Sequence, residues 1–236
     1  MENVSHDISV AGHRPALGFV FLGLMALDCV MTALAIGQYP AFLQQHLAWN
    51  YPLVLAGTEI AYAIAFWFVA RATKGPLFDA RKNAIVFGLA AGALEVVNIA
   101  IENVFPAAGG NPFVSVGFML TVFSIWGVGG AWTVRSGRSV GAGILTAVVG
   151  ASICMLIGVT AGLTVELFLA PLRPEVVSTW AEFKRSGWTD TRAFVVANTI
   201  ESAYTHLLMA PVVAVVFGSV GSVVGRFLPG RVAQAV

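Results

Sequence analysis

The residues best suited to chemistry in this sequence are two carboxylates, Glu95 and Glu102, with the amide of Asn98 between them. They stand in a run that is otherwise apolar enough to cross a membrane. In a helix that turns by about 100° per residue, the three side chains fall within roughly 80° of one another. Such groups are costly in lipid, so this polar stripe is predicted to face the interior of a bundle or a water-filled cavity.

Acidic residues are unusually frequent inside the apolar runs of this chain. Six of its twelve Asp and Glu residues lie there, and no Lys or Arg lies well inside one. An acid without a basic partner can be protonated, face water or hold a cation. The imbalance therefore predicts an acidic interior, although Glu166, near the end of its run, is also interpretable as a residue of the membrane interface. The six acids are Asp28, Glu59, Glu95, Glu102, Glu166 and Glu201.

A second polar stripe lies in the last apolar run, where Asn198, Glu201, Ser202, Thr205 and His206 fall within an arc of about 140°. We expect it to form the wall opposite Glu95. Glu201 and His206 are themselves about 140° apart, so the stripe alone assigns no metal-ligand set. The predicted substrate- or cation-binding residues are Glu95, Asn98, Glu102, Glu201, His206, Asp28, Glu59 and Asn198.

Membrane-spanning helices must position these residues. Of the 236 residues 58% are hydrophobic and 11% are charged, whereas a soluble domain carries about 25% charged residues. A spanning helix needs about 20 apolar residues. The sequence therefore predicts an all-α polytopic membrane protein, a six-transmembrane-helix bundle forming a single integral membrane domain over residues 1–236. The expected spans are about 16–37, 53–70, 84–105, 113–134, 140–169 and 193–228.

The last run and the connection before it have further expected features. At 1.5 Å per residue, 193–228 would be about 54 Å long, against a hydrocarbon core of about 30 Å. Pro211 predicts a kink in this helix or a break into two halves. Residues 174–186 read as an amphipathic helix on the outer surface. Small residues on the last span predict close helix packing: Gly218, Gly221, Ser222 and Gly225.

The distribution of basic residues predicts the orientation. Nine Lys and Arg residues fall at the two ends of the chain and in the second and fourth loops, and four fall on the other side. The positive-inside rule then places the protein in the cell membrane with both termini cytoplasmic. The nine are Arg14, Arg71, Lys74, Arg81, Lys82, Arg135, Arg138, Arg226 and Arg231, and the four are Arg173, Lys184, Arg185 and Arg192.

Several function classes find no support in the sequence. The formal net charge of +1 gives no basis for nucleic-acid binding. Cys29 and Cys154 lie inside expected spans and are interpreted as buried thiols rather than a disulfide. The chain has no His-Glu-x-x-His motif, phosphate-binding loop or Gly-x-Ser-x-Gly motif. Only one histidine, His206, lies in a span, so paired haem ligands are not expected. No cofactor is predicted, and enzymatic activity is not favoured.

The leading hypothesis is a proton-coupled transporter of a cation: a proton, a metal ion or a cationic organic molecule. Its partners would be the lipid bilayer and the cation. The alternative is a structural or accessory subunit that packs its polar helix faces on a second copy or a partner membrane subunit. A third, weaker interpretation is an intramembrane enzyme acting on a lipid, which would require a lateral opening at the depth of Glu95.

Overall fold

The computed structural model of the chain describes residues 14–44, 48–104, 112–169 and 174–228. All regular structure in these ranges is helical. Six helices are long and apolar enough to cross a membrane, which confirms the predicted all-helical architecture. They are α2 (Arg14–Gln38), α3 (Asn50–Arg71), α4 (Pro76–Val104), α6 (Pro112–Arg135), α7 (Val140–Thr164) and α10 (Thr191–Phe227).

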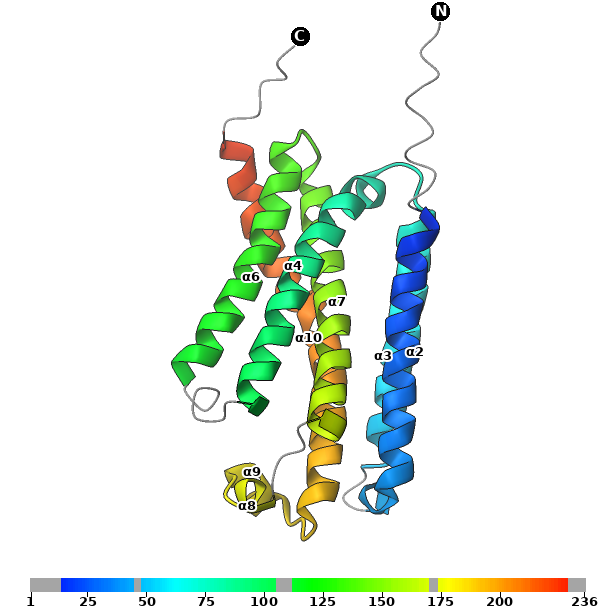
Figure 1. Cartoon of the computed structure of the whole chain (residues 1–236). Helices are drawn as coiled ribbons and strands as arrows, with labels where there is room; N and C mark the ends of the chain where they lie inside the picture. The colour runs from blue at the N-terminus through cyan, green and yellow to red at the C-terminus, as the bar shows by residue number, and fades with distance from the viewer. Residues whose placement is uncertain (1–13, 45–47, 105–111, 170–173, 229–236) are drawn as a thin grey trace, which may run out of the picture.

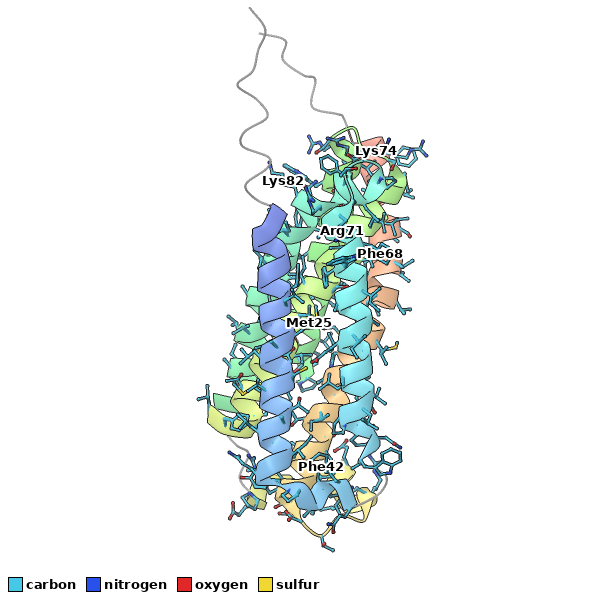
Figure 2. The ribbon with its side chains drawn as sticks, turned by 90° about the vertical axis from the view of Figure 1, so that its right-hand side faces the viewer. Met25, Phe42, Phe68, Arg71, Lys74 and Lys82 are labelled. Carbon is cyan, nitrogen blue, oxygen red and sulfur yellow. The ribbon has the colours of Figure 1, made fainter. Side chains whose placement is uncertain are left out.

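The helices are arranged around α7, which is the most buried of the six. Helices α4, α6 and α10 pack against it, and α2 and α3 lie together along another side of the bundle (Figure 1). Helix α2 begins and α10 ends at the same end of the molecule. Figure 2 shows Arg71, Lys74 and Lys82 at this end, which we call the basic end, and Phe42 at the other.

Four short helical segments complete the described chain. Three lie at the end away from the basic end (Figure 1), which we call the α8–α9 end. They are the 3-10 helix η1 (Pro40–Gln44), α8 (Pro174–Val177) and α9 (Ala181–Ser186). The fourth is a π-helix, η2 (Val165–Leu169), which continues α7 toward the α8–α9 end.

Helix α4 begins eight residues earlier than the sequence predicted, at Pro76 rather than near residue 84. Proline suits the first helical position because its missing N–H would have no partner there. Asp79 lies in the first turn, where a negative charge interacts favourably with the helix dipole. It also forms an ion pair of 2.6 Å with Arg138 in the α6–α7 turn. Arg81 and Lys82, which were expected in a loop, thus lie in the first turns of α4. The ion pair connects the start of α4 to the α6–α7 turn.

The predicted single surface helix over 174–186 is two short helices, α8 and α9. The break falls at two hydroxyl residues. Ser178 Oγ donates to Glu175 O at 2.8 Å and Thr179 Oγ1 donates to Val176 O at 2.6 Å. Such local bonds compete with helix continuation. Of the expected apolar face Val177 is buried, whereas Val176 is exposed, and the membrane-surface role of this segment stays a prediction.

The small residues of α10 make the close helix contacts that their pattern predicted. A Cβ atom built on Gly221 would collide with the backbone carbonyl of Gly127 in α6, and one on Gly225 would lie 2.5 Å from Ala131 O. On the same helix, a Cβ on Gly218 would lie 2.6 Å from Ala147 Cβ of α7. No side chain fits between these backbones, so the glycines set the distance from α10 to α6 and α7.

Pro211 does not break α10, which runs without interruption from Thr191 to Phe227. The predicted broken helix is therefore wrong, while a kink at Pro211 stays a prediction. Proline lacks an N–H, so the carbonyl of Leu207, four residues earlier, loses its helical partner. The buried Tyr62 hydroxyl of α3 donates to this carbonyl at 2.6 Å. A donor from a neighbouring helix thus satisfies the acceptor that the proline leaves open.

We expect Tyr62→Phe to lower the free energy of unfolding by about 0.5–1.5 kcal/mol, because it leaves Leu207 O without this donor. In a Pro211→Ala background the restored N–H can bond Leu207 O, so the same substitution should cost less. Reversible unfolding of the four proteins in detergent, followed by circular dichroism, measures this difference. Equal costs in the two backgrounds would contradict the link between Tyr62 and Pro211.

Candidate functional site

A cavity of about 350 Å³ lies among α4, α6, α7 and α10, in the half of the bundle nearer the α8–α9 end. Ligand sites in proteins range from about 300 to 1,000 Å³, so this volume suits a small molecule. Its described lining has several polar and acidic side chains but no Lys or Arg. The polar lining residues are Glu95, Asn98, Glu102, Ser115, Glu166, Thr199, Ser202 and His206.

Helix α4 supplies one wall of the cavity, as its polar stripe predicted. Glu95, Asn98 and Glu102 all line it. Glu102 Oε1 accepts a bond of 3.2 Å from Ser115 Oγ of α6. Asn98 Oδ1 is buried and has no hydrogen-bond partner among the described residues. Since buried polar atoms are nearly always paired in native proteins, this acceptor indicates a place for a donor that the described residues do not supply.

Helix α7 and its π-helical extension supply the second wall. Gly158 leaves room for Glu95, since a Cβ atom there would lie 2.9 Å from Glu95 Cγ. Glu166 lies in η2, lines the cavity and accepts from Thr199 Oγ1 of α10 at 2.8 Å. Glu166 therefore lines the cavity, which its interpretation as a residue of the membrane interface did not predict. A signal was available in the sequence, because Gly158, Gly162 and Glu166 recur every four residues and share one helix face.

Helix α10 contributes only part of its predicted stripe. Ser202 and His206 line the cavity, whereas Asn198 and Glu201 do not. Both of the latter residues are exposed, and Glu201 lies about 140° around α10 from His206. His206 Nδ1 lies 2.7 Å from Ser202 O in the preceding turn and 3.1 Å from Ser202 Oγ. This contact holds the imidazole by its Nδ1 edge.

The ionisable groups of the cavity are close enough to influence one another. Glu95 lies within electrostatic range of both Glu102 and His206. Glu166 likewise interacts with Glu102 and His206. Three carboxyl groups and one imidazole thus line the same partly open cavity. Repulsion among three charged carboxylates at low dielectric favours binding of protons or of another cation.

The remaining lining is apolar and partly aromatic. Phe123 and Trp126 of α6 lie with ring centroids 5.1 Å apart, and both line the cavity. Met119, Met155 and Met209 also contribute to it. Aromatic rings attract cations through their negative faces, most strongly where water is excluded. The lining thus combines carboxyl groups with aromatic and thioether surface.

Asp28 and Glu59 lie outside this cavity but near each other. Asp28 of α2 and Glu59 of α3 are both buried and within electrostatic range of one another. Cys29 Sγ donates to Glu59 Oε2 at 2.8 Å, and Thr160 Oγ1 of α7 donates to Asp28 Oδ1 at 2.6 Å. Thr160 thus links Asp28 of α2 to α7. The structure therefore separates the predicted site residues into two groups and leaves Asn198 and Glu201 outside both.

The described residues include no group of three or more His, Cys, Asp or Glu side chains placed to hold a metal ion. Both cysteines are free thiols, as expected, but only Cys154 is buried; Cys29 is exposed as a residue. A thiol, an imidazole and carboxyl groups are present without the convergence that a metal site requires.

Six apolar helices, four of which surround the cavity, form a helical bundle that is compatible with a multi-pass integral membrane protein. Nothing matched the chain in comparisons with models of protein families, with curated proteins and with solved structures.

Proposed function

We propose that this chain is an integral membrane protein that binds a small cation in the cavity and moves it across the membrane in exchange for protons. The observation that carries the proposal is the meeting of Glu95, Glu102 and Glu166 in one cavity whose described lining has no Lys or Arg. Carboxyl groups in such a space must be neutralised by protons or by a cation. Exchange between these two occupants is the basis of the mechanism.

The lining favours a cationic organic molecule over a bare metal ion. Phe123 and Trp126 offer aromatic surface, and Asn98 Oδ1 offers an acceptor to an N–H donor. The described residues provide no convergent metal-ligand set. A protonated or quaternary amine would place its charge among the carboxylates and its carbon atoms against the aromatic rings.

The proposed orientation is supported by the charge of the two ends. The basic end carries seven of the ten Lys and Arg side chains of the described helices and turns beyond α2, namely Arg71, Lys74, Arg81, Lys82, Arg135, Arg138 and Arg226. The positive-inside rule places this end in the cytoplasm. The cavity then lies in the outer half of the bundle. His206, which lines the cavity and is itself exposed, would pass protons between the carboxyl groups and the outer solution.

Uptake by proteoliposomes tests the proposal. We expect vesicles containing the full chain and an acidic lumen to accumulate a tritiated organic cation, tetraethylammonium, and to release protons as they do so. The variant Glu95→Gln with Glu102→Gln should reduce the uptake rate at least tenfold, because amides can neither release protons nor neutralise the cation. Glu201→Gln removes an acid of α10 outside the cavity and should retain the native rate.

Two results would contradict the transport proposal. One is uptake by the double variant at the native rate when its helicity is also native. The other is equal loss of uptake in Glu201→Gln, which would show that the cavity carboxyl groups have no special role. A set of cations of increasing size, from methylammonium to tetrapropylammonium, then measures how far the cavity limits the substrate.

A second candidate function, an accessory subunit, is favoured by the outer face of α10. Asn198, Glu201 and Thr205 are exposed there, within a helix that is long and apolar enough to span a membrane. Exposed polar groups on a spanning helix fit contact with a partner helix, although Glu201 already interacts with the Tyr51 hydroxyl of α3 in its own bundle. Purification in a mild detergent separates the two functions. Co-purification of a stoichiometric membrane partner that Glu201→Leu releases would favour the accessory role.

A further inference from the structure

The buried pair formed by Asp28 and Glu59 is the strongest polar feature that the cavity does not include. Asp28 is 0% exposed and Glu59 is 4% exposed. One oxygen of each accepts a hydrogen bond, from Thr160 and Cys29 respectively. The other oxygens, Asp28 Oδ2 and Glu59 Oε1, are buried without a hydrogen-bond partner among the described residues. Asp28 lies one turn beyond Met25, which Figure 2 labels on the face that α2 and α3 form.

A second observation at the same place concerns Thr32, one turn beyond Asp28 on α2. Its side chain is 7% exposed, and Thr32 Oγ1 also has no partner in the described chain. Three buried oxygens therefore lack a partner among the described residues: two on neighbouring turns of α2 and one on α3. Buried polar atoms normally have a partner, so a hydrogen-bond donor is expected at the two carboxyl oxygens.

None of the described basic side chains forms an ion pair with Asp28 or Glu59. Helix α10 also packs against α3, but its Glu201 interacts with Tyr51 and not with Glu59. Arg14 is fourteen residues from Asp28 and Arg71 is twelve residues from Glu59, which at 1.5 Å per residue is about 21 and 18 Å. Helix α7, which packs against α2, contains no Asp, Glu, Lys, Arg or His between Val140 and Thr164, and η1 contains none either. The titratable groups facing Asp28 are therefore Glu59 of α3 and Cys29 of its own helix. Two negative charges in this setting would have no counter-ion.

The hydroxyl of Thr160 can serve Asp28 in either protonation state. Thr160 Oγ1 lies 2.6 Å from Asp28 Oδ1 and 2.8 Å from Leu156 O. A hydroxyl carries one hydrogen and can also accept. When Asp28 is charged, Thr160 donates to it. When Asp28 carries a proton on Oδ1, that O–H donates to Thr160, whose own hydrogen turns to Leu156 O. Both states keep this contact, with only a rotation of the hydroxyl.

We propose that Asp28 and Glu59 form a proton-binding site, separate from the cavity, that takes up and releases one proton for coupled transport. A proton fits better than a hard metal cation, because such cations take about six or more oxygen ligands and the free oxygens here are Asp28 Oδ2, Glu59 Oε1 and Thr32 Oγ1. In the filled state one carboxyl is neutral and the other remains charged beside it. Release of the proton leaves both charged, with Thr160 and Cys29 as donors.

Thr160, which bonds Asp28, points away from Glu95 on the far side of α7 from Gly158. Gly158 of α7 contacts Glu95 in the cavity, whereas Thr160 contacts Asp28, and two residues apart on a helix corresponds to about 160° around it. Helix α7 is thus the only described helix that contacts the cation cavity on one face and Asp28 on the other. The coupling role rests on the proposed transport function, but proton binding by the pair does not.

Infrared spectroscopy of the full chain in lipid vesicles, without any added substrate, tests the proposal. We expect the difference between acidic and basic pH to contain the carbonyl stretch of a protonated carboxyl group in a dry environment. Asp28→Asn and Glu59→Gln should each remove that band. Glu95→Gln with Glu102→Gln should retain it, since those residues belong to the cavity. Thr160→Val should raise its titration midpoint by up to about one pH unit, because the hydroxyl bonds the charged carboxylate more strongly than it bonds the neutral acid, and Thr160→Ser should not.

The outcomes are distinguishable. A band that persists in Asp28→Asn and Glu59→Gln, or a native protein whose band does not titrate, would overturn the proposal. Loss of the band on adding Na⁺ at constant pH would overturn it in favour of a sodium site. If neither carboxyl variant folds, the Thr160→Val and Thr160→Ser pair decides, because both retain the two acids. A titrating pair in a protein without proton-coupled uptake would refute the transport function and leave the proton site intact.

Discussion

A leucine at position 221 should prevent the native packing of α10, with a loss of about 3 kcal/mol or more in the free energy of unfolding. The reason is steric. A Cβ atom on Gly221 would overlap the carbonyl of Gly127, and helix backbone, unlike the end of a flexible side chain, cannot turn aside. The two helices would have to separate along their length. Unfolding in detergent, followed by tryptophan fluorescence and circular dichroism, measures the effect.

Gly117→Leu provides the matched control for Gly221→Leu. Gly117 lies on α6, the same helix as Gly127, but a Cβ atom there would meet nothing within 4 Å. Leucine favours a helix over glycine by up to about 1 kcal/mol, so this variant should be as stable as the native protein or slightly more stable. Equal stability of the two leucine variants would show that α6 and α10 do not approach as closely as the structure has them.

The contrast between Gly117 and Gly221 shows where sequence reasoning about this chain reaches its limit. Both are helical glycines in apolar runs, and the sequence distinguished them only through the small residues spaced around Gly221. The six spans could be predicted because length and apolar composition determine which segments can cross a bilayer. The helix contacts depend on which faces meet, and that is settled by backbone fit between segments far apart in the chain.

The acidic residues show the same limit more sharply. Helical spacing was enough to place Glu95, Asn98 and Glu102 on one wall, because they belong to one helix. It was not enough to separate His206 from Glu201 on α10, since an arc of about 140° can face two different neighbours. The nearness of Asp28 to Glu59 depends on the packing of α2 against α3, and no periodicity within either helix contains that information.

The division of α10 also bears on the two candidate functions. Its Ser202 and His206 line the cavity, whereas Asn198 and Glu201 do not, and Glu201 interacts with Tyr51 of α3. Substitutions at Glu201 therefore report on contacts outside the cavity, and substitutions in the cavity report on ligand binding. The same substitution made at Glu95 in the cavity and at Glu201 outside it can therefore separate the transport function from the accessory function.

Charge reversal in the cavity should abolish binding of an organic cation. In Glu95→Lys a tethered ammonium group would lie near Glu102 and Glu166 and neutralise them, acting as an intramolecular competitor at an effective concentration in the millimolar range. We expect the affinity for tetraethylammonium to fall more than about 100-fold, because one carboxylate is lost and the lysine occupies the space of the cation. Isothermal titration calorimetry in detergent measures this affinity.

Glu201→Lys is the control, since it makes the same change in charge on the outward face of the neighbouring helix. Its affinity for tetraethylammonium should stay within about threefold of the native value, equivalent to less than 1 kcal/mol. The melting temperature of Glu95→Lys should not fall, because the new ammonium group relieves repulsion among the cavity acids. Native affinity in Glu95→Lys would contradict a cation site at Glu95. Lost affinity in both variants would point instead to the net charge of the protein as the source of binding.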